Sequence, residues 1–544
     1  MGTKLHKVIF NAKVYLRRET FTEAVLIEGE RIAAVGTNED ILRIMPGETQ
    51  LIDARGGVLL PGFQDCHVHL YYLGQKAKTL NAAGVSSIDE LIERGRRLLE
   101  ELKPPPGAFI TGWGLNQNDF ANTKRYPTRY DLDRISREHP IMVSRVCGHI
   151  IYCNSKALET AGITASTKAI EGGRIDIDET GTPTGRLTEN AAALVRRIVP
   201  VPTDSEMQAV LEWSMNHALS RGITGVGSYD TGGADFQQLV TVYRRIYRNG
   251  GSRLRISMQC GIAGDEKQLD AYIRRNLSTG LPLYPPYLKT GPLKLFADGS
   301  LGSHTAWLRR PYRDNPETTG VSVIKPAALA NLIKKADAQG LQVAVHAIGD
   351  AGIEAVLSAL ETVTGEHHNP LRHGVLHCQI TDRILLERMA KNDILALVQP
   401  IFLAEDMHIV EHRVGRELAS TSYAWATMER LGIRTAYGTD CPVASINPLA
   451  GIACAVTRQD RDGFPQAGFF PQERVDVYTA VDNYTIGTAY GNFDENRLGR
   501  ILPGYLADLV LLDRDIFSIP AQEIPSAQVV ITLVSGEIVY TRDV

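Results

Sequence analysis

The sequence predicts an α/β protein built on a (β/α)₈ TIM-like barrel, with a small β-sandwich domain built from both termini and an inserted subdomain after the first barrel strand. Three observations predict this architecture. Apolar strand-like runs alternate with helical segments through the middle of the chain. Short runs rich in β-branched residues occupy both ends. About 150 residues separate the first two barrel strands, far more than an ordinary connection needs.

The two ends of the chain have a similar sequence pattern. Short strands are expected at 7–16, 23–36 and 49–60, and again at 506–515 and 527–543, separated by Gly, Asn and Glu turns. We expect the ends to pair in one β-sandwich domain, with bounds 1–60 and 490–544. Two separate small sheets are the alternative.

The middle of the chain supplies eight strand candidates, most of which are followed by helix-like segments such as 326–340 and 351–363. This alternation favours a parallel barrel over 61–489. An open doubly wound sheet is the alternative, but no Gly-rich phosphate turn follows the first strand. The eight candidates are 58–70, 222–230, 254–261, 293–299, 341–350, 373–380, 394–400 and 433–443.

The long gap after the first strand has strand-like pieces of its own. They lie at 108–116 and 141–154. We therefore expect an inserted subdomain at 75–200, near the mouth of the active site.

Composition excludes several classes of function. The net charge of −4 gives no reason to expect nucleic acid or an anionic membrane as a partner. Seven cysteines without a CxxC pair are typical of reduced thiols rather than a disulfide framework. No run approaches the roughly 18 apolar residues of a membrane span, and the first residues lack the apolar core of a signal peptide. These features predict a cytoplasmic protein that acts on a small molecule.

The first polar cluster is Asp65-Cys66-His67-Val68-His69, which follows the apolar run VLLPGF. Alternate side chains of a strand share a face, so Asp65, His67 and His69 point the same way. The carboxyl ends of barrel strands carry the active site, and imidazole nitrogen is a good zinc ligand. An isolated HxH is nevertheless more often incidental than functional.

Later strand ends repeat this chemistry. His346, His377 and Asp440 each stand at the end of a predicted strand, and Lys294 lies within another. Each one alone fits a structural histidine, a capping aspartate or an ion-paired lysine. Their convergence at one barrel mouth would concentrate desolvated polar groups unless a cation is bound there. A Schiff base is one further role open to Lys294.

The motifs GFQDCHVHL, LKLFADGSLGS, VAVHAIGDAG, LHCQ and YGTDCPV, in this order, resemble those of the amidohydrolase superfamily. The chain is most similar to its amidohydrolase-3 branch, which includes N-substituted formamide deformylases. The likeness extends to the tail, in GRILPGYLADLVLLD and TLVSGEIVY, and so covers essentially the whole chain.

This resemblance implies a divalent metal centre with one or two ions, zinc being the expected metal. It implies that His67 and His69 bind one ion, that His346 and His377 bind the second, and that a carboxylated Lys294 bridges the two. Asp440 would contact the first metal and act as general base. Trp113 and His149 resemble positions that face the substrate, and a homodimer is expected on the same ground.

Three residues mark departures from the family pattern or alternatives within it. Cys66 stands where the family usually has Ser, and it should face away from the metals. His304 stands where Arg is frequent and would alter what the pocket accepts. Glu189 matches an acidic position of the family and would contact metal or substrate, an alternative to Lys294 as the bridging ligand.

The expected function is hydrolysis of an amide-like carbon–nitrogen bond by metal-activated water, with Asp440 passing the proton to the leaving nitrogen. One alternative is a deaminase acting on a nucleobase or pterin-like ring; many of these place Glu just after a strand histidine, whereas Ala-Ile-Gly-Asp follows His346. The second alternative is a non-catalytic assembly or regulatory barrel, although such relatives typically lose several of these ligands.

Overall fold

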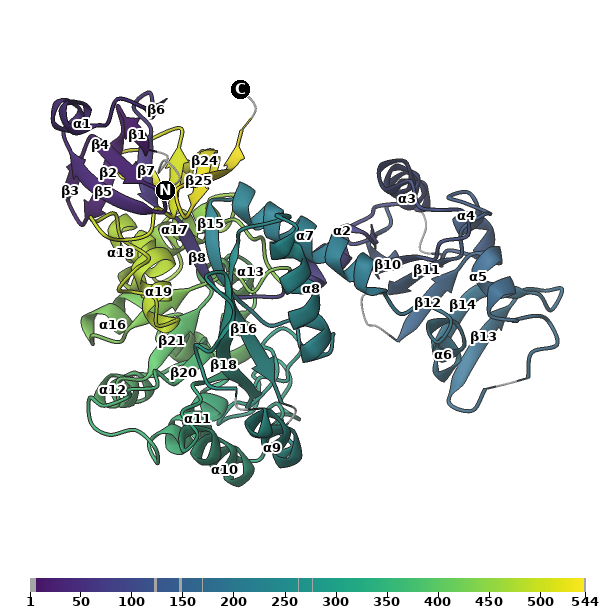
Figure 1. Cartoon of the computed structure of the whole chain (residues 1–544). Helices are drawn as coiled ribbons and strands as arrows, with labels where there is room; N and C mark the ends of the chain where they lie inside the picture. Colours follow the sequence, from purple (N-terminus) through teal and green to yellow (C-terminus); the bar gives the residue numbers. More distant parts are fainter. Residues whose placement is uncertain are drawn as a thin grey trace. The chain divides into compact units, whose positions relative to one another are not determined.

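The computed structural model describes residues 6–121, 125–145, 149–168, 170–262, 264–275 and 277–542 (Figure 1). The chain divides into two compact units. One unit combines Met1–Leu70 with Leu211–Val544, and the other is Tyr71–Val210. Within the described residues, no helix is long and apolar enough to cross a membrane.

Eight parallel strands form a nearly closed barrel in the first unit, as the sequence predicts. Seven of the strands lie inside the predicted runs, whereas the fourth begins at Leu288, five residues before the predicted run 293–299. Hydrogen-bonded neighbours within the barrel are parallel throughout. In spatial order the strands are β8 (Phe63–Val68), β15 (Ile223–Ser228), β16 (Arg255–Gly261), β18 (Leu288–Phe296), β19 (Val343–Ala347), β20 (Gly374–His377), β21 (Leu395–Val398) and β22 (Thr435–Tyr437).

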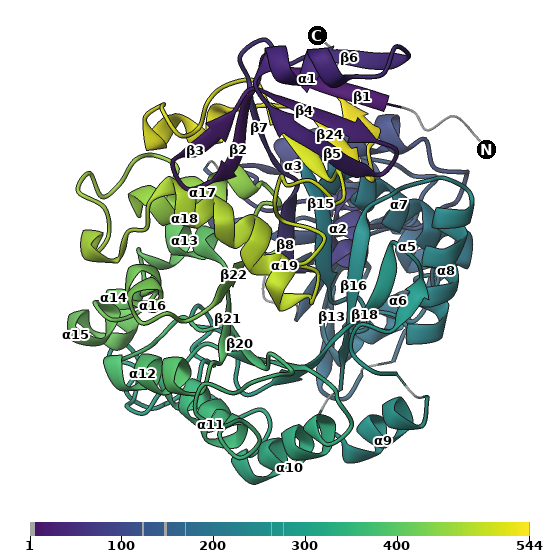
Figure 2. The same ribbon diagram turned by 60° about the vertical axis from the view of Figure 1, so that its left-hand side comes forward.

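Helices between successive strands cover the outside of the barrel (Figure 2). They bury apolar faces against the strands and expose charged ones, which is the pattern of an amphipathic helix. In α8 the buried side includes Leu239, Tyr243 and Ile246. The principal covering helices are α8 (Phe236–Arg248), α9 (Glu266–Arg274), α10 (Pro326–Asp337), α11 (Asp350–Leu360) and α12 (Arg383–Lys391).

The seam between β8 and β22 is bridged at the carboxyl ends of these strands. The backbone N–H of Asp440 donates to the carbonyl of His67 over 2.8 Å, and the N–H of His69 donates to the carbonyl of Cys441 over 2.8 Å. Gly438 permits this approach, because a Cβ there would lie 2.6 Å from an Asp65 carboxylate oxygen. The loop after β22 is thereby fixed against the HxH segment.

The predicted strand at 58–70 is in fact two strands. β7 (Val58–Pro61) belongs to a sheet outside the barrel, whereas β8 begins at Phe63. Gly62 separates them, and a Cβ at this position would lie 2.3 Å from the Thr224 side chain. One apolar run therefore serves two sheets, a division that hydrophobicity alone does not reveal.

Strands from both ends of the chain meet in one sheet. β7 pairs antiparallel with β23 (Leu509–Leu512), with Leu59 opposite Leu511. The six-stranded order is completed by β25 (Glu537–Thr541), β24 (Val529–Val534), β2 (Lys13–Arg17) and β3 (Thr20–Thr22). A second sheet holds β5 (Arg31–Gly36), β4 (Ala24–Glu28), β1 (His6–Phe10) and β6 (Thr49–Asp53).

The two terminal sheets contribute to one buried apolar cluster, which includes Val14, Val25, Ile27 and Leu533. Both sheets belong to the same compact unit as the barrel. A separate β-sandwich domain with the bounds given above stays a prediction.

The second compact unit contains a six-stranded sheet and the strand-like pieces noted in the sequence. Its long helix α3 (Ile88–Leu102) is capped by the Ser87 side chain, which accepts from the backbone N–H of Glu90. The sheet order is β13 (Gly173–Ile177), β14 (Pro183–Glu189), β12 (Ile150–Cys153), β11 (Ile141–Arg145), β10 (Ile110–Leu115) and β9 (Leu80–Asn81).

Candidate metal centre

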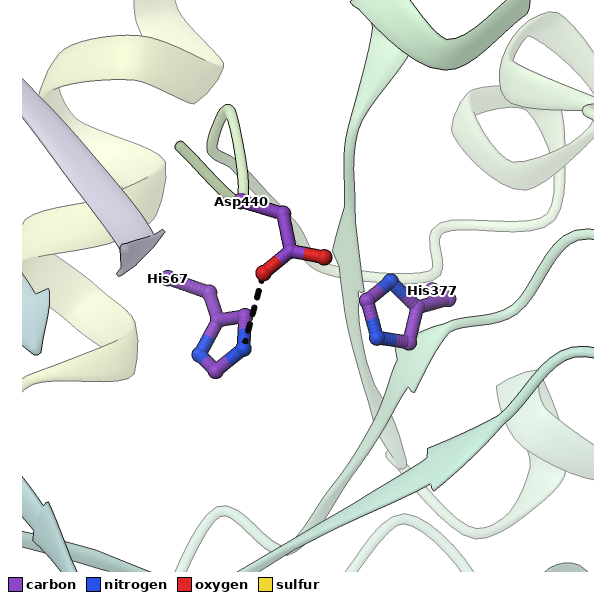
Figure 3. A group of neighbouring side chains, drawn as sticks. All are labelled: His67, His377 and Asp440. Atoms are coloured by element: carbon purple, nitrogen blue, oxygen red, sulfur yellow. Dashed lines mark ion pairs between the residues drawn. The ribbon is translucent and has the colours of Figure 1, made fainter. Parts of the chain in front are cut away.

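Three side chains from distant parts of the sequence converge inside the barrel (Figure 3). His67 comes from β8, His377 from the end of β20 and Asp440 from the loop after β22. All three are buried, and one ligand atom from each lies within 4.8 Å of the others. His67 Nε2 is 3.3 Å from Asp440 Oδ1. This spacing allows the three atoms to surround one cation.

His69 and His346 lie beside this group. His69 Nε2 is 2.9 Å from Asp440 Oδ1. The His346 ring centroid is 4.5 Å from that of His377. The four predicted histidines and the predicted aspartate are therefore neighbours at the carboxyl ends of the strands, where barrel active sites lie.

Two buried glutamines fix the tautomers of His67 and His377. Gln259 Nε2 donates to the carbonyl of Cys66 over 2.9 Å, so its Oε1 faces His67 Nδ1 at 2.6 Å. Gln399 Nε2 donates to the carbonyl of Leu397 over 3.3 Å, so its Oε1 faces His377 Nδ1 at 2.7 Å. Because an amide oxygen only accepts, Nδ1 carries the proton in both rings. The Nε2 lone pair is then available to a metal.

Backbone carbonyls orient the other two histidines. His69 Nδ1 donates to the carbonyl of Tyr229 over 2.9 Å, which leaves Nε2 for a ligand. His346 Nε2 instead donates to the carbonyl of Gly299 over 3.0 Å. His346 therefore offers Nδ1, unlike the other three rings.

Burial keeps most of the histidines neutral. It lowers the pKa of His67 to about 4 and that of His346 to about 3, with a further contribution from the charge of Lys294. Burial also lowers the pKa of His377 well below its usual value. Burial acts the same way on His69, but its hydrogen bond to Asp440 and the Asp440 charge outweigh burial and raise the pKa.

Asp440 is ionised despite its burial. Burial alone would raise its pKa, but its close contacts with the imidazoles of His67 and His69 hold the pKa of this carboxyl well below its usual range. Its backbone φ of 54° lies in the left-handed region, which few non-glycine residues adopt. The hydrogen bond from its N–H to His67 helps to hold this conformation.

Lys294 is fully buried in the same part of the barrel. Its ammonium nitrogen has no hydrogen-bond partner among the residues that the structure describes. The nitrogen lies 4.9 Å from the centroid of the Phe296 ring. Burial lowers the pKa of Lys294 to about 7, although the Asp440 charge opposes that change. A neutral amine is therefore accessible near neutral pH.

The Asp65 carboxylate connects two segments of the site through hydrogen bonds. Its carboxylate accepts from the backbone N–H groups of His67 and Thr439 and, over 2.6 Å, from the Thr439 hydroxyl. These bonds tie the strand of His67 to the loop of Asp440. Asp65 thus positions both segments.

Three predicted substrate contacts belong to the second compact unit. His149 Nδ1 is 3.0 Å from Glu189 Oε2, and both side chains are largely exposed. Trp113 lies on β10, and the Lys76 ammonium is 3.8 Å from the centroid of its ring. Substrate contact by these residues, and Glu189 as an alternative ligand, stay predictions.

His304 lies in the loop after β18. Its Nε2 is 3.2 Å from Asp314 Oδ1 and also contacts Arg413. Its ring packs edge-on against Tyr312, with the centroids 4.8 Å apart. These contacts join this loop to α14 (Val410–Val414). The effect of His304 on what the pocket accepts stays a prediction.

Sequence reasoning missed Gln259, Gln399 and Tyr229. A buried glutamine has no characteristic spacing, and the contribution of Tyr229 to His69 comes from its backbone. One signal was present: each residue stands at the carboxyl end of a predicted barrel strand.

The side chains of this site fit a divalent metal. Neutral imidazoles and an ionised carboxylate are the forms that bind metal. Buried groups of this kind are costly without a cation to balance them. Hydrogen bonds from the outer nitrogens of the rings also match the usual environment of histidine ligands.

Comparisons with known proteins agree with this interpretation. A model of the amidohydrolase family matches residues 50–540. YtcJ of Bacillus subtilis is 34% identical over 96% of both chains, and N-substituted formamide deformylase of Arthrobacter pascens is 26% identical over 98% of both. The crystal structure of an uncharacterized metal-dependent hydrolase from Pyrococcus furiosus is 28% identical, with a TM-score of 0.76, covering 94% of this chain and 100% of that one.

Proposed function

The chain belongs to the amidohydrolase family, and on that premise we propose that it hydrolyses a carbon–nitrogen bond other than a peptide bond in a small molecule. The observation that carries this proposal is the convergence of His67, His377 and Asp440. A relative named as a deformylase of N-substituted formamides supports the choice of an amide.

We propose that one or two divalent ions, zinc in the first instance, are held by His67, His69, His346, His377 and Asp440. When bound, such an ion lowers the pKa of water and polarises a carbonyl group. The ligand atoms would be Nε2 of His67, His69 and His377 and Nδ1 of His346, because the other nitrogen of each ring is hydrogen-bonded to the protein.

Lys294 is the candidate bridging residue. Its amine is buried, has no hydrogen-bond partner among the described residues and has a lowered pKa. Reaction of the neutral amine with CO₂ would release a proton and yield a carbamate, which supplies two oxygen ligands. The carbamate adds about 44 Da, and intact-protein mass spectrometry would detect it only if the carbamate survives the measurement. A crystal structure of the metal-loaded protein is therefore the better test.

Asp440 is the proposed proton carrier. Its carboxylate is ionised and lies beside the Nε2 atoms of His67 and His69, which supports a role in accepting a proton from water activated there. It accepts that proton and passes it to the departing nitrogen, as a general acid–base residue does.

A panel of simple amides tests the proposal. The wild-type protein, purified with zinc, should release acid and amine from at least one N-substituted formamide or acetamide, and Asp440→Asn should not. Release of ammonia from a nucleobase or pterin, with no amide cleaved, would support a deaminase instead. Absence of stoichiometric metal would support the non-catalytic alternative.

A further inference from the structure

A second feature of the barrel unit is a cavity of about 600 Å³. It lies where β15, β16 and β18 end, and residues from 231–236, from α9 and from the segment 323–324 complete its lining. This volume is within the range of small-molecule binding sites. None of the proposed metal ligands lines it.

The walls of the cavity are mainly apolar. Aromatic side chains on several sides include Phe236 and Tyr272, whose rings pack edge to face with centroids 6.3 Å apart. Ile262 and Ile324 add buried aliphatic surface. Such walls favour burial of an apolar group.

Most polar side chains of the lining are hydrogen-bonded or exposed; the exception is the Tyr272 hydroxyl, which is buried without a hydrogen-bond partner among the described residues. The Thr231 hydroxyl accepts from the N–H of Gly261, and the Asp235 carboxylate caps α8 by accepting from the N–H of Gln237. Gln268 and Arg275 are exposed to solvent. The interior therefore offers little to a charged ligand.

Two rings belong to both the cavity and the metal centre. Tyr229 lines the cavity, and its ring centroid is 5.5 Å from that of His69. Phe296 lines the cavity, and its ring centroid is 5.4 Å from that of His346. Each of these rings lies between the cavity and a proposed ligand, so the cavity is one side chain away from the candidate metal centre.

We propose that this cavity binds a large apolar group of the substrate, preferably aromatic, next to the bond that is cleaved. This inference rests on the proposed function for its position in the reaction. The preference comes from the apolar walls, which a phenyl group would contact over a larger area than a methyl group would.

Two pairs of amides test the proposal: phenylacetamide against acetamide, and N-benzylacetamide against N-methylacetamide. The pairs place the phenyl group on opposite sides of the amide bond. Affinity is measured by calorimetry on zinc-loaded protein, and turnover is followed separately by product release. In the wild type, the phenyl compound of at least one pair should bind at least tenfold more tightly.

Two variants fill the cavity. Ala271→Trp adds a ring from α9, and Val323→Trp adds one from a position that is 53% exposed and so tolerates a larger side chain. Either should cut the phenyl advantage at least fivefold. Arg274→Trp is the matched control, because Arg274 lies on α9 but does not line the cavity. Thermal melts check that each variant is folded.

The outcomes separate the two proposals. No phenyl advantage in the wild type, an advantage intact in both cavity variants, or an equal loss in Arg274→Trp would overturn the cavity assignment. A phenyl advantage in binding without cleavage of any amide would support the cavity assignment and contradict the proposed hydrolysis. Cleavage of an amide without a phenyl advantage in binding would support the proposed hydrolysis and overturn the cavity assignment.

Discussion

Replacing Gln399 by Leu tests how the metal ligands are oriented. The amide oxygen of Gln399 accepts from His377 Nδ1 over 2.7 Å, and its nitrogen donates to the carbonyl of Leu397. Leucine has a similar volume but neither polar atom. In the variant, the imidazole can rotate or carry its proton on Nε2, and either change removes the lone pair that would bind the proposed metal.

The expected magnitude follows from the geometry. Gln399 is buried, and its hydrogen bond is short. Loss of such a partner of a histidine ligand typically weakens metal binding by about 10- to 100-fold, which corresponds to roughly 1.4–2.7 kcal/mol. Gln399→Glu keeps an acceptor at the same distance from Nδ1 and should recover most of the affinity.

The assay is competition for zinc against a chromophoric chelator at pH 7.5. Gln379→Leu is the matched control, because Gln379 is equally buried and lies near His377 in the sequence, but its amide donates to Asp406. Unchanged zinc affinity in Gln399→Leu, or an equal loss in Gln379→Leu, would refute the orientation argument.

Three further predictions concern the same site. Asp440→Asn should lower kcat by about 10²–10⁴-fold while zinc content, measured by elemental analysis, stays near wild type, because four imidazoles remain; retained activity would refute the proton role. Gly438→Ala should weaken zinc binding and lower the melting temperature, since its Cβ would lie 2.6 Å from Asp65 Oδ1; wild-type values for both would contradict the close approach. In metal-free protein, His67 and His346 should each contribute a loss of stability from pH 7 to 5, because their lowered pKa values let the unfolded chain bind more protons there; burial raises the pKa of Asp65 and Asp298 to about 7, which opposes that loss. In urea unfolding, His346→Ala should therefore remove a loss of about 2 kcal/mol from the wild-type profile, and an unchanged profile would count against it.

The barrel could be predicted because its strands carry strong local signals. Each is a short apolar run that ends in polar residues, as in the run that closes on His346. The division of 58–70 into β7 and β8 is not visible in the hydrophobicity, since both strands are buried and no polar residue separates them; the Pro61-Gly62 pair is the local signal of a break. Only the close approach of Thr224 explains why Gly62 stands there.

The convergence of the candidate ligands at one barrel mouth was predictable, whereas the groups that orient them were not. His67 and His377 stand at strand ends, where side-chain type and position together indicate function. Gln259 and Gln399 act through hydrogen bonds between different strands, and these depend on a register that periodicity does not supply. Neither could sequence patterns reveal the cavity, because its walls come from loops and helices far apart in the chain.

Elemental analysis of the purified protein, expressed with zinc supplied, tests the central claim most directly. The wild type should carry about one or two equivalents of divalent metal per chain, and a folded His67→Ala, His377→Ala double variant should carry almost none. A folded wild-type protein without stoichiometric metal, or a double variant that retains the full amount, would contradict the claim that these imidazoles and Asp440 surround a cation.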